Sequence, residues 1–237
     1  MMREPSWRFK PSESTSVRAS LGSGFRAATV FEKYIEADHS GFTIIPNPDL
    51  RPESAWSWDI GIRQSFGEYH HVECSFFQSD YEDMIEPVIN FLGTIQYQNF
   101  VRARIRGVEC FAESWHWRRR LGLRGSLTWM DPENLKTGET LPYRPRFSGN
   151  VEAILKLGDF RLSAEYQYAS RIENVEIRPL DPRVPTKLAH IRAEYAWREF
   201  RVQVAVTNLL NYHYTQVEQR MAEVRKYTLS LLFDTGK

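Results

Sequence analysis

The sequence predicts an all-β fold, an antiparallel up-and-down segment of a transmembrane β-barrel with about ten strands. Three features predict it: apolar residues recur at every second position, short turns alternate with long loops, and tryptophans fall at the ends of the expected strands. Membrane barrels combine these features because alternate side chains face lipid and water, and because the long loops all lie at one end.

The clearest pair of strands lies in the second half of the chain. From Phe160 to Tyr168, apolar or aromatic residues alternate with polar ones, and the stretch from Phe147 to Leu157 shows the same alternation. Only Gly158 and Asp159 separate the two stretches. A two-residue connection between alternating stretches is typical of a tight β-hairpin.

The same alternation predicts strands along most of the chain. We expect them at Ser16–Phe25, Ser54–Phe66, Tyr69–Glu82, Ile95–Trp117, Leu121–Met130, Arg144–Leu157, Phe160–Ser170, Lys187–Trp197, Phe200–Asn208 and Lys226–Phe233. Each is near the length that a tilted membrane-crossing strand needs.

The connections between these strands are of two kinds. The tight ones are expected at Gly67–Glu68, Arg118–Arg120, Gly158–Asp159 and Arg198–Glu199. The long ones are expected at Arg26–Glu53, Asp83–Thr94, Asp131–Tyr143, Arg171–Thr186 and Leu209–Arg225. Because the two kinds alternate strictly, every long loop lies at one end of the sheet, as in outer-membrane barrels.

Tryptophan positions are an independent observation, since indole rings favour the boundary between lipid headgroups and hydrocarbon. Beside long loops lie Trp56, Trp58 and Trp129, and beside short turns lie Trp7, Trp115, Trp117 and Trp197. The alternative explanation is that aromatic residues mark strands in any β protein. Because none falls in mid-strand, we expect two interfacial belts.

The composition agrees with a single membrane-barrel unit. The chain has 237 residues, 42% of them hydrophobic, and a net charge of +1, with a mean hydropathy of -0.49. No apolar run approaches the ~18 to 20 residues of a spanning helix. The near-neutral charge gives no argument for a nucleic-acid partner, and no linker or low-complexity tract indicates a second domain.

Two cysteines, Cys74 and Cys110, fall on the side of neighbouring strands that we assign to lipid. A free cysteine in such surroundings behaves as a small apolar residue. We therefore expect no structural disulfide.

The first residues of the chain can also be interpreted within this fold. Met1–Phe9 lacks the basic segment and apolar core of a secretory signal. Trp7–Phe9 instead read as the end of a preceding strand, with Lys10–Thr15 as its turn. The chain is therefore expected to be cut from a longer barrel.

Five short segments carry a resemblance to a known family. In chain order they are Gly24–Thr29 with Phe31 and Glu32, Asn47–Glu53, Ala103–Glu109, Thr207–Asn211 with Tyr214, and Tyr227–Leu231 with Phe233. Together they resemble the conserved segments of TonB-dependent outer-membrane receptors. The sequence departs from that pattern at Ala28, where the family has proline, and at residues 234–237, which extend beyond the terminal aromatic Phe233.

The resemblance implies the C-terminal part of a 22-stranded barrel around a plugged lumen. Residues 1–14 would be the tail of a preceding strand plus a periplasmic turn, 15–233 about ten strands, and 234–237 a C-terminal extension. The plug domain and the other strands would be missing from this chain. The resemblance places it in the bacterial outer membrane.

The implied function is active uptake of a scarce ligand such as a ferric siderophore, cobalamin, haem or a glycan, for which this chain would not suffice alone. The implied partners are outer-membrane lipid, the missing plug and strands, a small-molecule ligand, and the TonB energy-coupling complex acting through the plug. No enzyme activity and no cofactor are expected.

Two sets of residues are candidates for the site. Long-loop residues that could contact an incoming ligand are Tyr34, His39, Phe42, Phe91, Tyr97, Tyr143, Arg144, Arg171, Arg178 and His213. Residues expected on the lumen wall are Arg63, Arg102, Arg104, Arg124, Arg161, Glu165, Arg192, Glu194 and Arg201. An inward charge avoids the ~2 to 4 kcal/mol that a charge costs on the lipid side, although a generic solvated wall would show the same residues.

No metal site and no catalytic residues are expected. His70 and His71 are adjacent and therefore point to opposite faces of a strand, and His116 adds no zinc-type spacing. The acidic residues Asp80, Glu82, Asp83 and Glu86 around Tyr81 could approach a hard cation, but a solvated loop mouth explains them better. No GxSxG segment or other readable nucleophile and base occurs.

Two alternatives remain open at this point. A stand-alone small outer-membrane barrel, acting as a passive pore, anchor or adhesin, would close on itself by pairing the strand near Ser16 with that near Lys226. A soluble β-sandwich or carbohydrate-binding module would bury the apolar residues between two sheets, but has no need for all long loops at one end.

Overall fold

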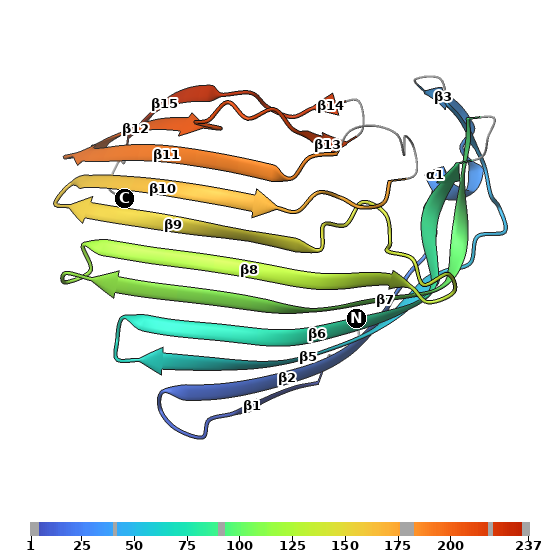
Figure 1. Ribbon diagram of the computed structural model, residues 1–237, viewed down its shortest axis with the longest axis horizontal. Coiled ribbons are helices and arrows are strands. Elements are labelled where there is room, and N and C mark those ends of the chain that lie inside the picture. Colours follow the sequence, from blue (N-terminus) through green and yellow to red (C-terminus); the bar gives the residue numbers. More distant parts are fainter. Residues whose placement is uncertain (1–4, 40–41, 90–92, 176–182, 218–219, 234–237) are drawn as a thin grey trace.

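The long strands form one curved antiparallel sheet (Figure 1). The computed structural model describes residues 5–39, 42–89, 93–175, 183–217 and 220–233. Within them the strand order is β1-β2-β5-β6-β7-β8-β9-β10-β11-β12-β15, β3 and β4 join this sheet beside β7, and β13 pairs only with β14. The sandwich alternative is wrong, because the crossing strands share one sheet instead of two that face each other.

The strands of the wall agree closely with those expected. They are β1 (Ser6–Phe9), β2 (Thr15–Arg26), β5 (Glu53–Phe66), β6 (His70–Ile89), β7 (Thr94–His116), β8 (Leu121–Asn134), β9 (Phe147–Leu157), β10 (Phe160–Ala169), β11 (Thr186–Trp197), β12 (Phe200–Thr207) and β15 (Lys226–Phe233). All ten predicted strands are confirmed, and Ser6–Phe9 form a further short strand, β1.

The long connections contain short elements that the sequence did not reveal. They are α1 (Val30–Tyr34), β3 (Ala37–His39), β4 (Phe42–Ile45), β13 (Thr215–Val217) and β14 (Arg220–Met221). In the described part of the chain, no helix is long and apolar enough to cross a membrane.

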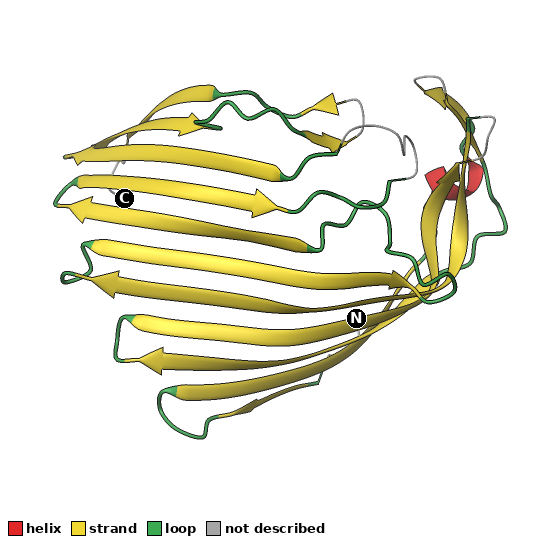
Figure 2. Cartoon of the chain, viewed as in Figure 1, coloured by secondary structure: helices red, strands yellow, loops and turns green. Residues whose placement is uncertain are grey.

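The predicted loop from Asp83 to Thr94 is wrong for much of its length. β6 continues to Ile89 and β7 begins at Thr94, so the two strands extend beyond the wall as a hairpin (Figures 1 and 2). Their register skips Asp83, whose φ is 55°. The register is the same on both sides of Asp83, so its positive φ is a local kink without an inserted residue. Beyond the kink, β7 pairs in parallel with β4.

Residues directly opposite each other on neighbouring strands lie on the same face of a sheet, and here they sort by polarity. Ile60, Phe76, Val108 and Trp129 form one row across β5 to β8. Apolar residues of this face are widely exposed, for example Val151 at 59%. So large an exposed apolar surface marks a contact with lipid, and we call it the apolar face.

The opposite side of the sheet, the polar face, carries charged rows. Glu113, Arg124, Glu152 and Glu165 stand opposite one another from β7 to β10. Arg124 lies 3.3 Å from Glu113 and 3.8 Å from Glu152 in ion pairs. The strand register therefore confirms the predicted division of the sheet into an apolar face and a polar face.

Cys74 and Cys110 form a disulfide, so the prediction of two unpaired cysteines is wrong. The two residues lie directly opposite each other on β6 and β7, with their Cα atoms 4.1 Å apart. That distance is typical of non-hydrogen-bonded pairs, which bring cross-strand side chains closest. The sequence placed both on the lipid side but not in register.

Trp115 does not belong to an interfacial belt. It lies on the polar face opposite Gly122 and is only 6% exposed. Other tryptophans at the two ends of the wall do have exposed rings, including Trp56 at 60% and Trp197 at 56%. The belt prediction is therefore wrong for Trp115. What a side chain contacts depends on the face of the sheet from which it projects, as well as on its position along the strand.

The short turns use two kinds of backbone. Gly67 and Gly158 adopt positive φ values of 65° and 58°, which cost glycine little. In the β7–β8 turn, Trp117, Arg118 and Arg119 have φ values of 49°, 53° and 66° without any glycine. Arg120 closes this turn by donating its backbone N–H to the carbonyl oxygen of His116 over 3.0 Å.

β1 and β15 stand at the two ends of the strand order. Among the described residues, β2 pairs with β1 and β5, and β15 pairs with β12. The self-closing small barrel requires β2 to pair with β15, and the described register does not contain that pairing.

Candidate functional site

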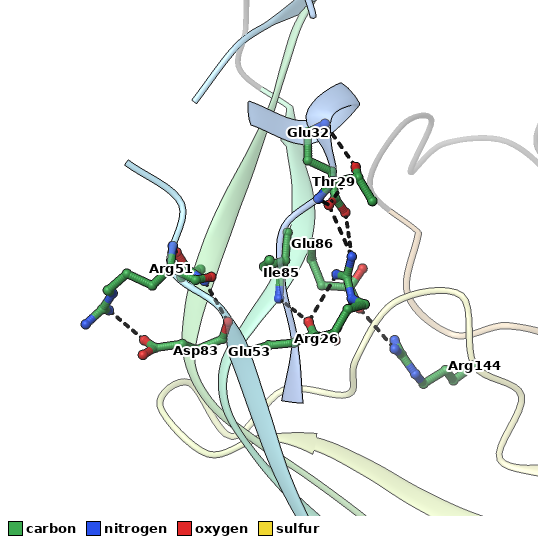
Figure 3. A network of polar contacts seen from close by, with 10 residues as sticks. Arg26, Thr29, Glu32, Arg51, Glu53, Asp83, Ile85, Glu86 and Arg144 are labelled. Carbon is green, nitrogen blue, oxygen red and sulfur yellow. Dashed lines mark hydrogen bonds and ion pairs between the residues drawn. The ribbon is translucent and has the colours of Figure 1, made fainter. Parts of the chain in front are cut away.

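At the long-loop end, Arg26 connects three separate segments of the chain (Figure 3). Its Nε donates to Glu53 Oε1 over 2.7 Å, and its Nη1 donates to Glu32 Oε1 over 3.0 Å. Glu53 in turn accepts a hydrogen bond from the Ile85 backbone N–H over 2.9 Å. Arg26 therefore joins the end of β2, the start of α1 and the start of β5, and Glu53 extends this link to the β6–β7 hairpin.

Helix α1 begins with a capping box. The Thr29 hydroxyl accepts from the Glu32 backbone N–H over 3.2 Å, and the Thr29 backbone N–H donates to Glu32 Oε2 over 2.6 Å. Such reciprocal bonds satisfy donors that the first helical turn leaves open. Glu32 thus serves both the helix and Arg26.

The hydrogen bonds and charges of this network favour the ionised forms of Glu32 and Arg26. Burial alone would raise the pKa of Glu32, but hydrogen bonds from Thr29 and the Arg26 guanidinium outweigh it and hold this pKa below its usual value. The hydrogen bond to Glu53 raises the pKa of Arg26 above its ordinary range. The pair is therefore charged at any physiological pH.

The kink at Asp83 is held by the Asn47–Glu53 segment. Arg51 Nη2 lies 2.6 Å from Asp83 Oδ1, and the Arg51 backbone N–H donates to Asn99 Oδ1 over 2.9 Å. Asn99 also donates through Nδ2 to the Asp83 carbonyl oxygen over 2.7 Å. One of the motif segments found in the sequence, Asn47–Glu53, thus contacts both strands of the β6–β7 hairpin where its direction changes.

The acidic residues around Tyr81 do not converge on an empty point. Each pairs with its own arginine: Asp80 with Arg104, Glu82 with Arg102, Asp83 with Arg51 and Glu86 with Arg144. Within the described ranges, no group of three or more His, Cys, Asp or Glu side chains could hold a metal ion. Solvated ion pairs account for this acidic cluster.

The long-loop candidates fall into three groups. Exposed and available are Tyr34, Arg171 and His213. Engaged in contacts within the chain are Tyr97, whose ring meets Phe31 edge-on at 6.2 Å, Arg144, 3.0 Å from Glu86, and Tyr143, whose N–H donates to Asn174. His39 and Phe42 are described only as strand residues of β3 and β4, and Phe91 and Arg178 lie outside the described residues.

Most of the expected lumen-wall residues lie on the polar face. By register these are Arg63, Arg124, Arg161, Glu165, Arg192, Glu194 and Arg201. Arg102 and Arg104 lie instead on the parity of Cys110, so the prediction is wrong for them. They can occupy the apolar side because they stand at the long-loop end, beyond Trp129, where each has a carboxylate partner.

The predicted divergence of His70 and His71 is confirmed. His70 Nδ1 lies 2.6 Å from Ser114 Oγ, and Ser114 Oγ lies 2.8 Å from His116 Nε2. His71 instead contacts Phe111, with ring centroids 5.5 Å apart. The two histidines therefore belong to opposite faces.

Sequence reasoning missed several residues that have partners on other segments of the chain. Arg26, Glu32 and Glu53 lie within the motif segments but were not singled out as a network, although the Thr29–Glu32 spacing is that of a capping box. Lys156 was also missed; its Nζ lies 4.2 Å from the centroid of the Trp115 ring. Only the cross-strand register brings these two residues together.

A curved sheet with one lipid-facing and one wet face, and with long loops at one end, defines the wall of a membrane-spanning β-barrel. The family model for the TonB dependent receptor-like β-barrel matches residues 6–209. The chain belongs to this family, whose members are receptors of the bacterial outer membrane and not enzymes.

Curated relatives and solved structures agree with this assignment. Hemoglobin-haptoglobin utilization protein B of Neisseria meningitidis serogroup C is 34% identical over 80 residues, covering 34% of this chain and 10% of that protein. Heme/hemopexin utilization protein C of Haemophilus influenzae is 25% identical over 232 residues, covering 83% of this chain and 32% of that protein.

A crystal structure of a ferric enterobactin receptor variant from Pseudomonas aeruginosa matches 97% of this chain with a TM-score of 0.78 at 16% identity. This likeness shows the fold. The chain spans 39% of that receptor, and its matches span still smaller shares of the two curated relatives.

Proposed function

We propose that this chain supplies part of the wall and long-loop end of a receptor that takes up an iron-bearing cargo, haem or a ferric siderophore. In this proposal the cargo first meets the exposed long-loop residues and then passes along the polar face. A plug domain and the TonB energy-coupling complex act as partners, and outer-membrane lipid covers the apolar face.

The observation that carries the proposal is that hydrogen bonds hold the long-loop end in place, in a chain that belongs to a receptor family. Arg26, Glu53 and Asn99 fix the β6–β7 hairpin and α1 through hydrogen bonds, so side chains at this end are held in place. Binding residues on loops work best when a rigid scaffold positions them. The printed names of the relatives, which refer to haem, hemoglobin and ferric enterobactin, favour iron-bearing cargo.

The test is a direct titration of haemin and of ferric enterobactin into the full chain, folded in neutral detergent. Tyr34→Ala with His213→Ala removes two exposed candidates, and we expect about tenfold weaker binding of the cargo that binds. Tyr227→Ala, which removes an exposed tyrosine of β15, is the matched control and leaves the affinity unchanged. Failure of both compounds to bind contradicts the proposal.

A further inference from the structure

The polar face contains a cavity of about 240 Å³ near the short-turn ends of β7 to β12. Trp115 and Ile154 form its apolar base, and each is only 6% exposed. Arg124, Lys156, Arg161 and Arg192 surround this base. No part of the long-loop network described above reaches it.

The base of the cavity depends on a glycine. Gly122 lies directly opposite Trp115, and a Cβ atom at position 122 would stand 2.7 Å from Trp115 Cζ3. Glycine therefore lets the indole lie close against β8. Lys156 Nζ sits 4.2 Å from the ring centroid, a cation–π contact that fixes the ammonium group above the base.

The charges around the cavity are not balanced. Lys156 lies directly opposite Arg161 on the neighbouring strand, an arrangement in which like charges destabilise a sheet. Glu194 lies opposite Arg161 but forms its ion pair with Arg201, at 3.5 Å. Among the described residues, Lys156, Arg161 and Arg192 have no ion pair.

The remaining carboxylate of the cavity, Glu152, is paired with Arg124. Glu152 lies 3.8 Å from Arg124, which is also paired with Glu113 at 3.3 Å. The buried Arg124 Nε atom is the one that lies 3.3 Å from Glu113 Oε2, so Arg124 already has carboxylate partners. Three cations without carboxylate partners among the described residues, Lys156, Arg161 and Arg192, therefore converge on the same cavity.

We propose that this cavity binds the carboxylate or phosphate group of an anionic solute. An anion would separate the facing charges of Lys156 and Arg161, and the arginine guanidinium groups offer paired donors that suit such oxygens. The inference rests on the proposed uptake function only for the source of the solute. If the chain takes part in uptake, the solute is a cargo that carries carboxylates or is an anionic chelate. The cavity then binds this cargo on the half of the polar face that lies toward the short turns.

The experiment is isothermal titration of citrate and of inorganic phosphate into the full chain, folded in a neutral maltoside detergent. We expect saturable binding that weakens as salt is added. The triple variant K156Q/R161Q/R192Q should lose at least about tenfold in affinity, which corresponds to about 1.4 kcal/mol. The control K33Q/K136Q/R225Q removes the same charge at the long-loop end and should bind like the unmodified chain.

Two further variants separate a local site from a general charge effect. R161K/R192K keeps the charge but loses the paired donors, so it should fall between the triple variant and the unmodified chain. Gly122→Ala moves the indole beneath Lys156 and should weaken binding without changing net charge. Each variant is first checked for β-sheet content by circular dichroism.

Absence of saturable binding of both anions, or equal loss of affinity in the triple variant and its control, overturns the inference. The result is independent of the proposed cargo test, which uses haemin and ferric enterobactin and alters residues at the other end of the wall. Anion binding without haemin or ferric enterobactin binding would leave the cavity assigned and contradict only the iron-bearing cargo.

Discussion

Cys74 on β6 and Cys110 on β7 face each other across one position of the ladder and are joined by a disulfide on the apolar face. The bond closes a segment with a sequence separation of 36 residues. In the chain-entropy model, closing a loop of this length lowers the entropy of the unfolded chain and so raises its free energy by roughly 4 kcal/mol at 25 °C. Outer-membrane proteins mature in the oxidising periplasm, where such bonds persist.

The disulfide yields the first prediction. The unreduced, denatured chain should take up no maleimide, and the reduced chain should take up two, measured by mass. Cys74→Ser with Cys110→Ser should lower the unfolding free energy by about 2 to 4 kcal/mol, measured by urea denaturation in detergent. Labelling of two thiols without reduction would contradict the assignment.

A second prediction compares two glycines of the wall. A Cβ atom at Gly107 would clash with the Trp129 carbonyl oxygen and stand 2.8 Å from Phe77 Cζ, whereas at Gly125 the nearest atom would be 3.6 Å away. Gly107→Ala should therefore cost about 1 to 3 kcal/mol, and Gly125→Ala should be close to neutral. Urea midpoints measure both, and equal midpoints would refute the close approach at Gly107.

The third prediction tests which face meets lipid. Leu127 on the apolar face and Thr128 on the polar face are neighbours in β8. Leu127→Arg should cost about 2 to 4 kcal/mol in a bilayer because it places a charge in hydrocarbon. Thr128→Arg, the control, should cost much less. Unfolding in lipid vesicles is the measurement, and the reverse order would exchange the two faces.

The fourth prediction concerns the Arg26 network. Arg26→Ala removes the contacts to both Glu32 and Glu53, and should ease local opening of residues 27–52 by about 1 to 2 kcal/mol. Arg51→Ala removes a single, more exposed ion pair and should have the smaller effect. Limited proteolysis of the folded protein measures the opening, and equal cleavage rates in the two variants would contradict the prediction.

A fifth prediction follows from the lowered pKa of Glu32. Because the folded-state pKa lies below the unfolded value of about 4.3, the stabilisation is fully present above that value. It is lost as the pH falls through the folded-state pKa. The protection factors of the amides in residues 29–35, which compare measured with intrinsic exchange rates, should therefore stay constant down to about pH 4 and fall below it. Glu32→Gln should abolish this pH dependence.

Much of the fold could be predicted because period-two alternation and turn chemistry are local properties. The Phe147–Leu157 and Phe160–Ala169 hairpin was recognisable from its alternation and from Gly158 alone. The extension of β6 and β7 was not, because the kink at Asp83 interrupts the alternation and is held by Arg51 and Asn99, which lie elsewhere in the sequence.

The site was predictable only in part, because its contacts depend on register. Arg161 and Arg192 were placed correctly on the wet side by parity, but their convergence with Lys156 needed the pairing of three strands. The same holds for Cys74 and Cys110, whose alignment no local pattern specifies. Tyr34 and His213 remain predictions as ligand contacts.

The β7–β8 turn has a consequence for how the wall assembles. Trp117, Arg118 and Arg119 each adopt the left-handed conformation, which costs residues with a side chain roughly 1 to 2 kcal/mol apiece. A free peptide of this sequence would rarely visit that shape, so the turn cannot initiate its own hairpin. We therefore expect β7 and β8 to pair first, through cross-strand contacts away from the turn. The turn then adopts its left-handed conformation because the paired strands hold its two ends together.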